Sequence, residues 1–352
     1  MRGNLKFSNT LIMWYLINKR DLPWRKSKDP YLIWLSEIIL QQTRIAQGTS
    51  YYEKFASEFD DIFDLAVADE KTILKLWQGL GYYSRARNLH STAKMVASQY
   101  NGQFPNSYSE LIKLKGIGDY TASAIASIAF DQPYATVDGN VFRVLSRVFG
   151  INTPINESKG IKEFKLLADE LLDPNDPGTH NQALMEFGAL VCTPKKPKCD
   201  TCVFNHTCFA LQEKSIDVLP VKLKKLKIRK RYFNYLVLDI KGESTVLRQR
   251  KHKDIWQNLF EFPLYETLGD LQDESELVEI IRSKLLNNGS FTLKKYNELP
   301  IIHKLTHQTI YTSFWIVKPK EKPENVTSWQ ELKDLALPVL LQNFVDKYQS
   351  AN

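Results

Sequence analysis

The chain has 352 residues, more than a single hydrophobic core usually supports, so two domains are expected. Its residues are 43% hydrophobic and 25% charged, with no tract dominated by Gly, Pro or Gln, which excludes a disordered or fibrous protein. The formal net charge is +7, and the apolar runs are too short for a signal peptide or a membrane span, so the sequence predicts a cytoplasmic protein without a membrane partner.

Residues 1–210 have the pattern of a helical domain, because apolar residues recur there at three- and four-residue spacing. Asp29 followed by Pro30 is a typical helix start and predicts a helix from Tyr31 to about Gln47. Within it, the apolar neighbours of Glu37 predict a poorly solvated carboxyl group with a raised pKa, suited to donating a proton near neutral pH. The alternative is a salt-bridged glutamate on an exposed helix face.

A glycine-containing segment runs from Trp77 to Arg85. It combines flexible glycines with tyrosines, Tyr82 among them, and an arginine, which suits it to wedging into a base stack and gripping a phosphate. The alternative is a helix–helix turn whose tyrosines lie in the core.

Two helices joined by a tight turn are predicted over residues 107–130. Ser107 begins a capping-box pattern that opens the first helix, and Tyr120–Phe130 forms the second. Between them, Gly116 and Gly118 allow the backbone to turn sharply and direct N–H groups where a DNA phosphate can be held. Taken alone, the glycine pair fits an ordinary helix–helix turn better.

Asp138 strengthens the phosphate-binding interpretation because it follows the glycine turn and starts another predicted helix. It is a candidate N-cap, which is a purely structural role. An aspartate beside a phosphate-holding turn can also lie next to the attached sugar, where it would stabilise a developing positive charge.

All the cysteines of the chain fall in one short segment, separated by six, two and five residues. In a cytoplasmic protein this pattern indicates a metal or cluster site rather than disulfides. Zinc and [4Fe–4S] both accept four thiolates, but zinc ribbons usually pair two short Cys-x2-Cys knuckles, so the cluster is favoured. The predicted ligands are Cys192, Cys199, Cys202 and Cys208.

Basic residues concentrate in two places. Lys195, Lys196 and Lys198 lie in the first cysteine loop, where a bound cluster would fix them in a shape that matches a phosphate backbone. Between Lys222 and Arg231, seven of ten residues are basic. That run could meet a polyanion or simply form an extended linker.

A second domain of mixed α and β type is predicted beyond the basic run. The expected division is a helical domain over 1–210, a basic linker over 211–228 and an α+β domain over 229–352. Predicted strands are Tyr232–Asp239, Ser244–Arg250, Ile301–Thr306 and Thr309–Val317, and predicted helices are Glu274–Leu286 and Trp329–Tyr348.

Together these motifs resemble the helix-hairpin-helix DNA glycosylases that carry an iron–sulfur cluster, and most closely the MutY family of adenine DNA glycosylases. The resemblance covers nearly the whole chain and implies an all-α helix-hairpin-helix glycosylase domain with a [4Fe–4S] loop, followed by an α+β Nudix-like domain. Its most specific elements are Leu22–Arg25, Ser36–Arg44, Gly79–Arg85, the glycine turn, Val137–Asn140 and the four cysteines.

The resemblance implies a monofunctional enzyme that removes adenine mispaired with 8-oxoguanine or guanine from duplex DNA, acting as a monomer at the bacterial nucleoid. The adenine is flipped out of the duplex, and Glu37 protonates its N7. Asp138 stabilises the oxocarbenium-like sugar or traps it covalently. Tyr120 and Asn140 match residues that hydrogen-bond these carboxyl groups and the substrate.

The same resemblance assigns further DNA contacts. The adenine pocket would be lined by Trp24, Arg25, Ile45 and Gln182. Residues inserted around the vacated site would be Gln42, Thr43 and Tyr82. Thr306 and His307 match a loop that reads the oxidised guanine, although its first residue, a phenylalanine in the family, is Leu305 here.

The sequence supports three other functions less well. An endonuclease III type glycosylase and lyase places a catalytic lysine where this chain has Tyr120, lacks the acid found as Glu37 and typically lacks a second domain. A catalytically idle duplex-binding protein would not need both Glu37 and Asp138. A Nudix diphosphate hydrolase needs a metal-binding box of glutamates, which is absent between residues 230 and 352.

Overall fold

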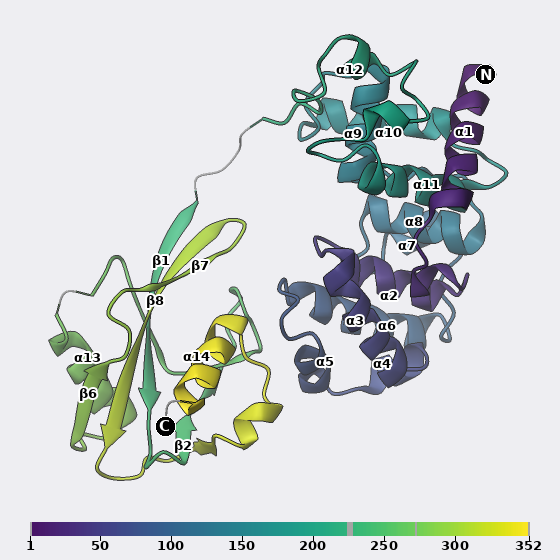
Figure 1. Ribbon diagram of the computed structural model, residues 1–352. Helices are drawn as coiled ribbons and strands as arrows, with labels where there is room; N and C mark the ends of the chain where they lie inside the picture. Colours follow the sequence, from purple (N-terminus) through teal and green to yellow (C-terminus); the bar gives the residue numbers. More distant parts are fainter. Residues whose placement is uncertain (1, 224–227, 272, 351–352) are drawn as a thin grey trace. The chain divides into compact units, whose positions relative to one another are not determined.

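The structure is a computed structural model that describes residues 2–223, 228–271 and 273–350. Of the basic run, Lys224, Lys225 and Lys227 lie outside these residues. The chain divides into two compact units (Figure 1). The first comprises Met1–Ala68 with Arg87–Lys224, and the second comprises Asp69–Ala86 with Lys225–Asn352.

The first unit is helical, as the sequence predicts. Asp29 caps a helix that begins at Pro30, its carboxylate accepting a hydrogen bond from the backbone N–H of Tyr31 at 2.8 Å. Helix α6, Ser84–Gln99, begins in the second unit and continues into the first. The other helices are α1 (Arg2–Asn18), α2 (Pro30–Leu40), α3 (Ile45–Glu58), α4 (Ile62–Val67), α7 (Tyr108–Leu111), α8 (Asp119–Phe130), α9 (Gly139–Phe149), α10 (Ser158–Leu171), α11 (Pro177–Leu190) and α12 (Phe209–Gln212), with 3-10 turns η1 (Pro23–Arg25) and η2 (Cys199–Thr201).

The single helix predicted from Tyr31 to about Gln47 is wrong, because the structure has two helices there. Helix α2 ends at Leu40, and α3 begins at Ile45. Between them, the backbone of Gln42 has φ of 55°, a left-handed conformation that side chains with a Cβ rarely adopt. Gln, Thr and Arg are all tolerated inside helices, so local propensity gave no sign of this break.

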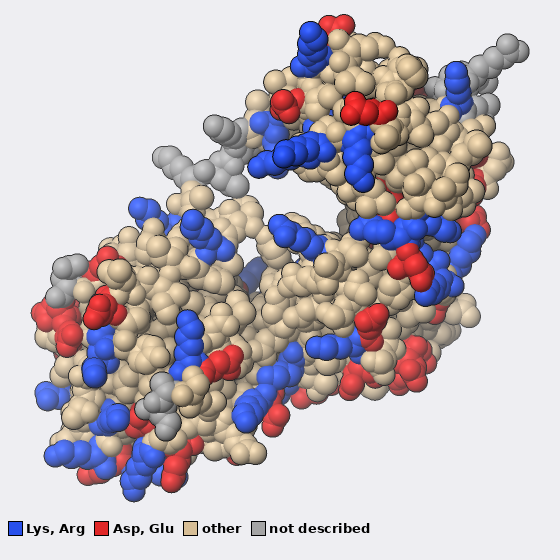
Figure 2. Space-filling view, in the orientation of Figure 1, with Lys and Arg blue, Asp and Glu red and all other residues tan. Residues whose placement is uncertain are grey.

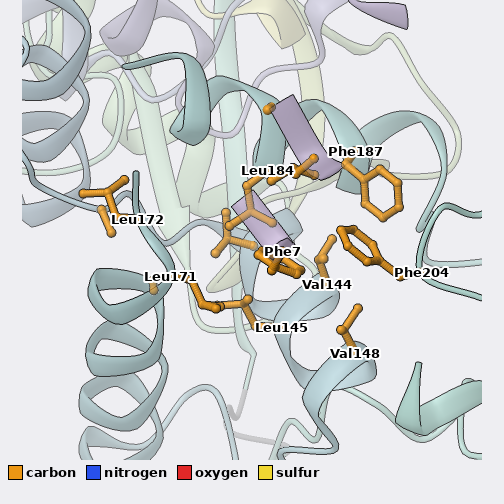
Figure 3. Packing of buried hydrophobic residues seen from close by; sticks show 14 of the residues in the cluster. Phe7, Val144, Leu145, Val148, Leu171, Leu172, Leu184, Phe187 and Phe204 are labelled. Carbon is orange, nitrogen blue, oxygen red and sulfur yellow. The ribbon is translucent and has the colours of Figure 1, made fainter. Parts of the chain in front are cut away.

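A hydrophobic core joins the N-terminal helix to the cysteine loop (Figure 3). Phe204 of the loop is buried and stacks on Phe7 of α1, with ring centroids 4.7 Å apart. It also meets Phe187 of α11 edge-on at 5.3 Å. Burial of one such ring contributes roughly 1.5–3 kcal/mol, so the loop is anchored in the core of the first unit.

The second unit is built on a mixed sheet with strand order β5-β1-β8-β6, and β7 pairs with the remaining part of β8. Strands β1 and β8 run parallel, in register from Arg229 opposite Gln308 to Leu238 opposite Val317. The other pairings in this sheet are antiparallel. The strands are β1 (Arg229–Leu238), β2 (Ser244–Val246), β3 (Arg248–Gln249), β4 (Phe260–Glu261), β5 (Leu264–Thr267), β6 (Phe291–Lys295), β7 (Ile301–Lys304), β8 (Gln308–Pro319) and β9 (Val326–Ser328).

Helices cover both faces of this sheet (Figure 1). Successive side chains of a strand point to opposite faces. Phe233 and Tyr235 of β1 therefore belong to the core that contains α14 (Val339–Ser350), whereas Leu236 and Leu238 belong to the core that contains α13 (Ser275–Ile280). Helix α5 (Glu70–Leu76) also belongs to this unit.

Three predicted elements of the second unit are interrupted. The helix expected over Trp329–Tyr348 is a 3-10 turn, η4 (Glu331–Asp334), followed by α14, because Pro338 allows a helix to start after it but not to pass through it. The helix expected over Glu274–Leu286 continues from α13 into a π-helical turn, η3 (Ile281–Leu285). The strand expected over Ser244–Arg250 is divided into β2 and β3.

Candidate active site and cysteine loop

Glu37 is a partly buried acid on α2, and its neighbours Ser36 and Ile38 are buried. Burial raises the pKa of its carboxyl group to about 7, as the hydrophobic sequence around it predicts. A hydrogen bond with Tyr120 acts against this rise, Asp138 adds to it by charge repulsion, and the positive charge of Arg25 also lowers the pKa. Glu37 can therefore hold a proton near neutral pH and release it to a substrate.

Tyr120 lies in the first turn of α8 and connects Glu37 to helix α11. Its hydroxyl lies 3.1 Å from the Sδ atom of Met185 and forms a hydrogen bond with the carboxyl group of Glu37. Burial raises the pKa of Tyr120 well above its usual value, so the side chain stays a neutral phenol. It can position the acid, but it cannot supply the amine that a lyase needs for a Schiff base.

Asp138 is the N-cap of α9, as the sequence suggested. Its Oδ1 accepts the backbone N–H groups of Asn140 and Val141, both at 2.8 Å, and its Oδ2 accepts from Nδ2 of Asn140 at 2.7 Å. Burial raises its pKa, while these hydrogen bonds act to keep it ionised, helped by the positive end of the helix. Glu37 and Asp138 thus form a pair of interacting carboxyl groups in different environments, which is how one site provides both an acid and an anion.

Arg143 connects this site to the cysteine loop, a role that the sequence did not reveal. Its Nη2 donates to Oδ1 of Asn140 and to the carbonyl oxygen of Gly188, both at 2.8 Å, and its Nε donates to the carbonyl oxygen of Cys192 at 2.6 Å. The amide of Asn140 is thereby oriented with its NH2 group toward Asp138. The available signal was an arginine three residues after Asn140, followed one helical turn later by Arg147.

Arg25 and Gln182, both predicted to line the adenine pocket, meet through Tyr15. The guanidinium of Arg25 lies over the Tyr15 ring at 5.4 Å, and the Tyr15 hydroxyl donates to Oε1 of Gln182 at 2.8 Å. Arg25 also forms an ion pair with Glu186 at 2.9 Å, a partner that the sequence did not predict. Trp24 instead packs edge-on against Tyr52, with ring centroids 5.4 Å apart.

The residues predicted to enter DNA near this site lie in the break after α2. Gln42 is exposed and has the left-handed backbone that ends the helix. Thr43 follows it, its backbone N–H bonding the carbonyl oxygen of Leu40 at 3.0 Å. Ile45, which is predicted to line the adenine pocket, is partly buried and begins α3. The break places Gln42 and Thr43 in an irregular loop rather than on a helix face.

The glycine turn lies between α7 and α8, but its two glycines differ. Gly116 has φ of 81°, and a Cβ there would approach Cβ of Asn88 to 2.8 Å, so conformation and packing both require glycine. Gly118 is the extended N-cap of α8, and a Cβ there would meet nothing within 4 Å. The open space at Gly118 leaves the first amides of α8 accessible to an anion.

The second unit contains the other predicted DNA contacts. Tyr82 is 45% exposed, and its hydroxyl forms a hydrogen bond with Oγ1 of Thr306. Thr306 and His307 are exposed in the turn between β7 and β8, as predicted. Leu305 packs against the core that contains α14, so the residue that replaces the family's phenylalanine faces the protein.

The four cysteines line one cavity, together with Arg147 and Phe187 among others. Cys192 follows α11, Cys199 begins η2, Cys202 follows η2 and Cys208 is the N-cap of α12. Arg147 fixes the first turn of the loop, its Nη1 donating to the carbonyl oxygen of Thr193 at 2.8 Å and lying 3.5 Å from Sγ of Cys192.

The chemistry of this cavity fits a [4Fe–4S] cluster, which the four cysteines hold. Burial raises the pKa of Cys202 to about 11, and a bound metal centre would favour its ionised form. Within the described residues, no three His, Cys, Asp or Glu side chains converge on a single-ion site. A [4Fe–4S] cubane accepts four thiolates, each of which binds a different iron atom.

Iron analysis checks this assignment. Native protein purified without oxygen is expected to contain about four iron atoms per chain and to absorb broadly near the boundary of the visible and ultraviolet regions. Cys202→Ser should lower both signals together because it removes one ligand. Stoichiometric zinc in place of iron would contradict the assignment.

The cysteine loop presents lysines at the surface. Lys195, Lys196 and Lys198 are all exposed. Over the face drawn in Figure 2, basic and acidic side chains are interspersed rather than forming one continuous basic field. Local lysine groups, rather than the overall charge, are therefore the better candidates for phosphate contacts.

No helix in the described parts of the chain is long and apolar enough to span a membrane.

Comparisons with known proteins agree along the chain. Residues 35–169 match the HhH-GPD superfamily of base excision DNA repair proteins, residues 192–208 the iron–sulfur binding domain of endonuclease III, and residues 234–347 the NUDIX domain. An adenine DNA glycosylase of Buchnera aphidicola (subsp. Schizaphis graminum) is 33% identical, the alignment covering 97% of this chain and 99% of that protein. One from Buchnera aphidicola (subsp. Baizongia pistaciae) is 37% identical, with 99% and 98% covered.

Solved structures resemble part of the chain. A thermostable thymine-DNA glycosylase has a TM-score of 0.56 and 30% sequence identity, with 60% of this chain and 98% of that chain covered. A non-covalent endonuclease III–DNA complex has a TM-score of 0.53 and 20% identity, with 61% and 98% covered, and supports the fold alone.

Proposed function

Because the chain belongs to the family of adenine DNA glycosylases, we propose that it hydrolyses the N-glycosidic bond of adenine mispaired with 8-oxoguanine or guanine in duplex DNA. The observation that carries this proposal is the carboxyl pair of Glu37 and Asp138. Glu37 has a pKa of about 7, whereas Asp138 accepts three N–H hydrogen bonds at a helix start. Such a pair can protonate a leaving group on one side and face a cationic sugar on the other.

The proposed reaction begins when the mispaired adenine leaves the base stack. Glu37 donates its proton to N7 of the base, and the bond between the sugar C1′ and adenine N9 breaks with its electron pair moving to the neutral adenine. Asp138 stabilises the resulting oxocarbenium-like sugar or bonds to it, and Asn140 holds the aspartate in place. Water then adds at C1′, its proton returns to the site, and an abasic sugar remains.

The DNA duplex would be held by elements on both sides of this pair. The amides behind Gly118 and the exposed lysines of the cysteine loop suit phosphate contacts. The bound [4Fe–4S] cluster supplies a fixed loop shape rather than a reaction step. We assign residues 1–210 to the glycosylase domain, 211–228 to a basic linker and 229–352 to lesion recognition, in a monomer that acts at the bacterial nucleoid.

A single-turnover assay on a duplex with one adenine opposite 8-oxoguanine tests the activity. Release of free adenine, with none from an otherwise identical duplex that has adenine opposite thymine, is expected. Binding without release would favour an idle duplex-binding protein. A borohydride-trapped covalent adduct above background would favour an endonuclease III type lyase, because only an amine forms the reducible Schiff base.

The turn of Thr306 and His307 is the proposed reader of the oxidised guanine. A hydroxyl and an imidazole offer hydrogen-bond donors and acceptors to its altered edge. Thr306→Ala combined with His307→Ala is expected to reduce the kinetic preference for 8-oxoguanine over guanine, by the loss of one or two hydrogen bonds of about 0.5–1.5 kcal/mol each. The ratio of adenine-release rates on the two duplexes measures this.

Lys251→Ala combined with His252→Ala is the matched control, since it changes two exposed polar residues elsewhere in the second unit. Its rate ratio should equal that of the unaltered protein. If the Thr306 and His307 variant also keeps that ratio, the turn does not read the lesion and the second unit serves as a scaffold.

A further inference from the structure

Glu186 is a buried carboxylate to which the proposed reaction gives no task. It lies on α11 with 1% of its surface exposed. Its Oε1 accepts from Nε of Arg20 at 2.8 Å and from Nη1 of Arg25 at 3.1 Å, and its Oε2 accepts from Nη2 of the same arginines at 2.6 and 2.9 Å. Burial alone would raise the pKa of Glu186, but these hydrogen bonds lower it to about 2, so the group is an anion at any physiological pH.

The carboxylate fixes Arg25 in one place. Nη1 of Arg25 also donates to the carbonyl oxygen of Arg20 at 3.2 Å, and its guanidinium rests on the ring of Tyr15. Tyr15 in turn holds Gln182, which precedes Glu186 by one turn of the same helix. The partners of Arg25 therefore come from α1, from the loop before η1 and from α11.

The position of Arg25 affects the acid. Glu37 faces Tyr120 from α8, Asp138 from the N-terminus of α9 and Arg25 from η1, and the charge of Arg25 stabilises the ionised form of Glu37. A guanidinium released from Glu186 would have Glu37 as an alternative carboxylate partner. Because attraction between unit charges grows steeply at short distance in a poorly solvated site, such pairing would deprive Glu37 of its proton.

We propose that Glu186 is a positioning residue for base excision, which holds the guanidinium of Arg25 and thereby prevents it from pairing with Glu37. The inference rests on the proposed role of Glu37 as the acid. Glu186 would not touch the adenine or the sugar, and its effect would be transmitted through Arg25.

The test is the pH dependence of single-turnover adenine release by Glu186→Gln. In the unaltered protein the rate should fall as pH rises through about 7, because Glu37 then loses its proton. With a neutral amide at position 186, Arg25 should pair with Glu37 and lower the pKa of Glu37. The pH range in which the rate falls, called here the alkaline limb, should therefore move to lower pH. If the alkaline limb moves by about one pH unit, adenine release should be about tenfold slower at pH values above the limb. At pH values below the limb, the rate should decrease much less.

Glu261→Gln is the matched control. Glu261 is also buried and paired with an arginine, Arg250, but it belongs to the second unit. Its variant should keep the limb at the original pH. The iron content should be unchanged in Glu186→Gln, which separates a change in the pKa of the acid from a change of fold.

A Glu186→Gln enzyme that is slower by the same factor at every pH would overturn the inference, because that pattern indicates only a structural role. If this variant does not fold, Glu186→Asp decides. Its side chain is shorter by one methylene group, so its carboxylate binds Arg25 less well. An alkaline limb at lower pH supports the inference, and a limb at the original pH overturns it. Adenine release by Glu37→Gln would instead refute the proposed acid itself, independently of Glu186.

Discussion

Glu37→Gln is expected to slow adenine release by roughly 10²–10⁴-fold, the usual contribution of a positioned acid. The amide keeps the shape of the side chain and can still hydrogen-bond to Tyr120, but it has no acidic proton to give to adenine. Binding to a mispaired duplex should change little. Single-turnover rates, together with affinity for a duplex carrying an uncleavable analogue, measure the two effects separately.

The same variant should not be less stable than the unaltered protein above neutral pH. The folded-state pKa of Glu37, about 7, lies above its ordinary value of 4.5, so this carboxyl group lowers the stability of the fold as pH rises between those values. Removing this charge should increase the free energy of unfolding by up to about 3 kcal/mol at higher pH, which a chemical denaturation curve at pH 8 would detect. Glu163→Gln, on an exposed face of α10, is the control and should change neither rate nor stability. Substantial release by Glu37→Gln would exclude Glu37 as the acid.

Asp138→Asn is expected to slow release by about 10²–10³-fold, the typical cost of removing one electrostatic group from a reacting centre. Asparagine is as good an N-cap as aspartate, so its oxygen can keep accepting the N–H groups of Asn140 and Val141. The negative charge that faces the sugar is lost. Rates of adenine release on the 8-oxoguanine duplex measure this effect.

Asp61→Asn is the matched control because Asp61 caps α4 in the same way, accepting from the N–H groups of Phe63 at 2.7 Å and Asp64 at 3.0 Å. Both variants should unfold at nearly the unaltered temperature, apart from a small loss in Asp138→Asn, where two amide groups would meet at Asn140. A full rate of release by Asp138→Asn would show that the aspartate is only a helix cap.

The parts of the protein that the sequence determined by itself depend on short-range physics. The helix start at Asp29 needs only one carboxylate and a proline, and Gly116 reveals a left-handed turn by its residue type. Nearly continuous runs of apolar and aromatic residues define β1 and β8, and hydrophobic neighbours predict the raised pKa of Glu37. In each case the physical cause lies within a few residues of the feature, so the feature can be predicted from the sequence.

What only the tertiary structure decided depends on contacts between distant segments. The left-handed Gln42 ends α2 although Gln42 has no unusual helix propensity. Glu186 meets Arg25 although the two lie 161 residues apart in the chain, and Arg143 ties Asn140 to Cys192. Such pairings produce no periodic pattern in the sequence. Packing, together with the free-energy cost of leaving a buried charge unpaired, decides which side chain becomes the partner of that charge. The sequence therefore indicated Glu37 and Asp138 as the candidate reacting groups, and the fold revealed Arg143 and Glu186, which hold Asn140 and Arg25.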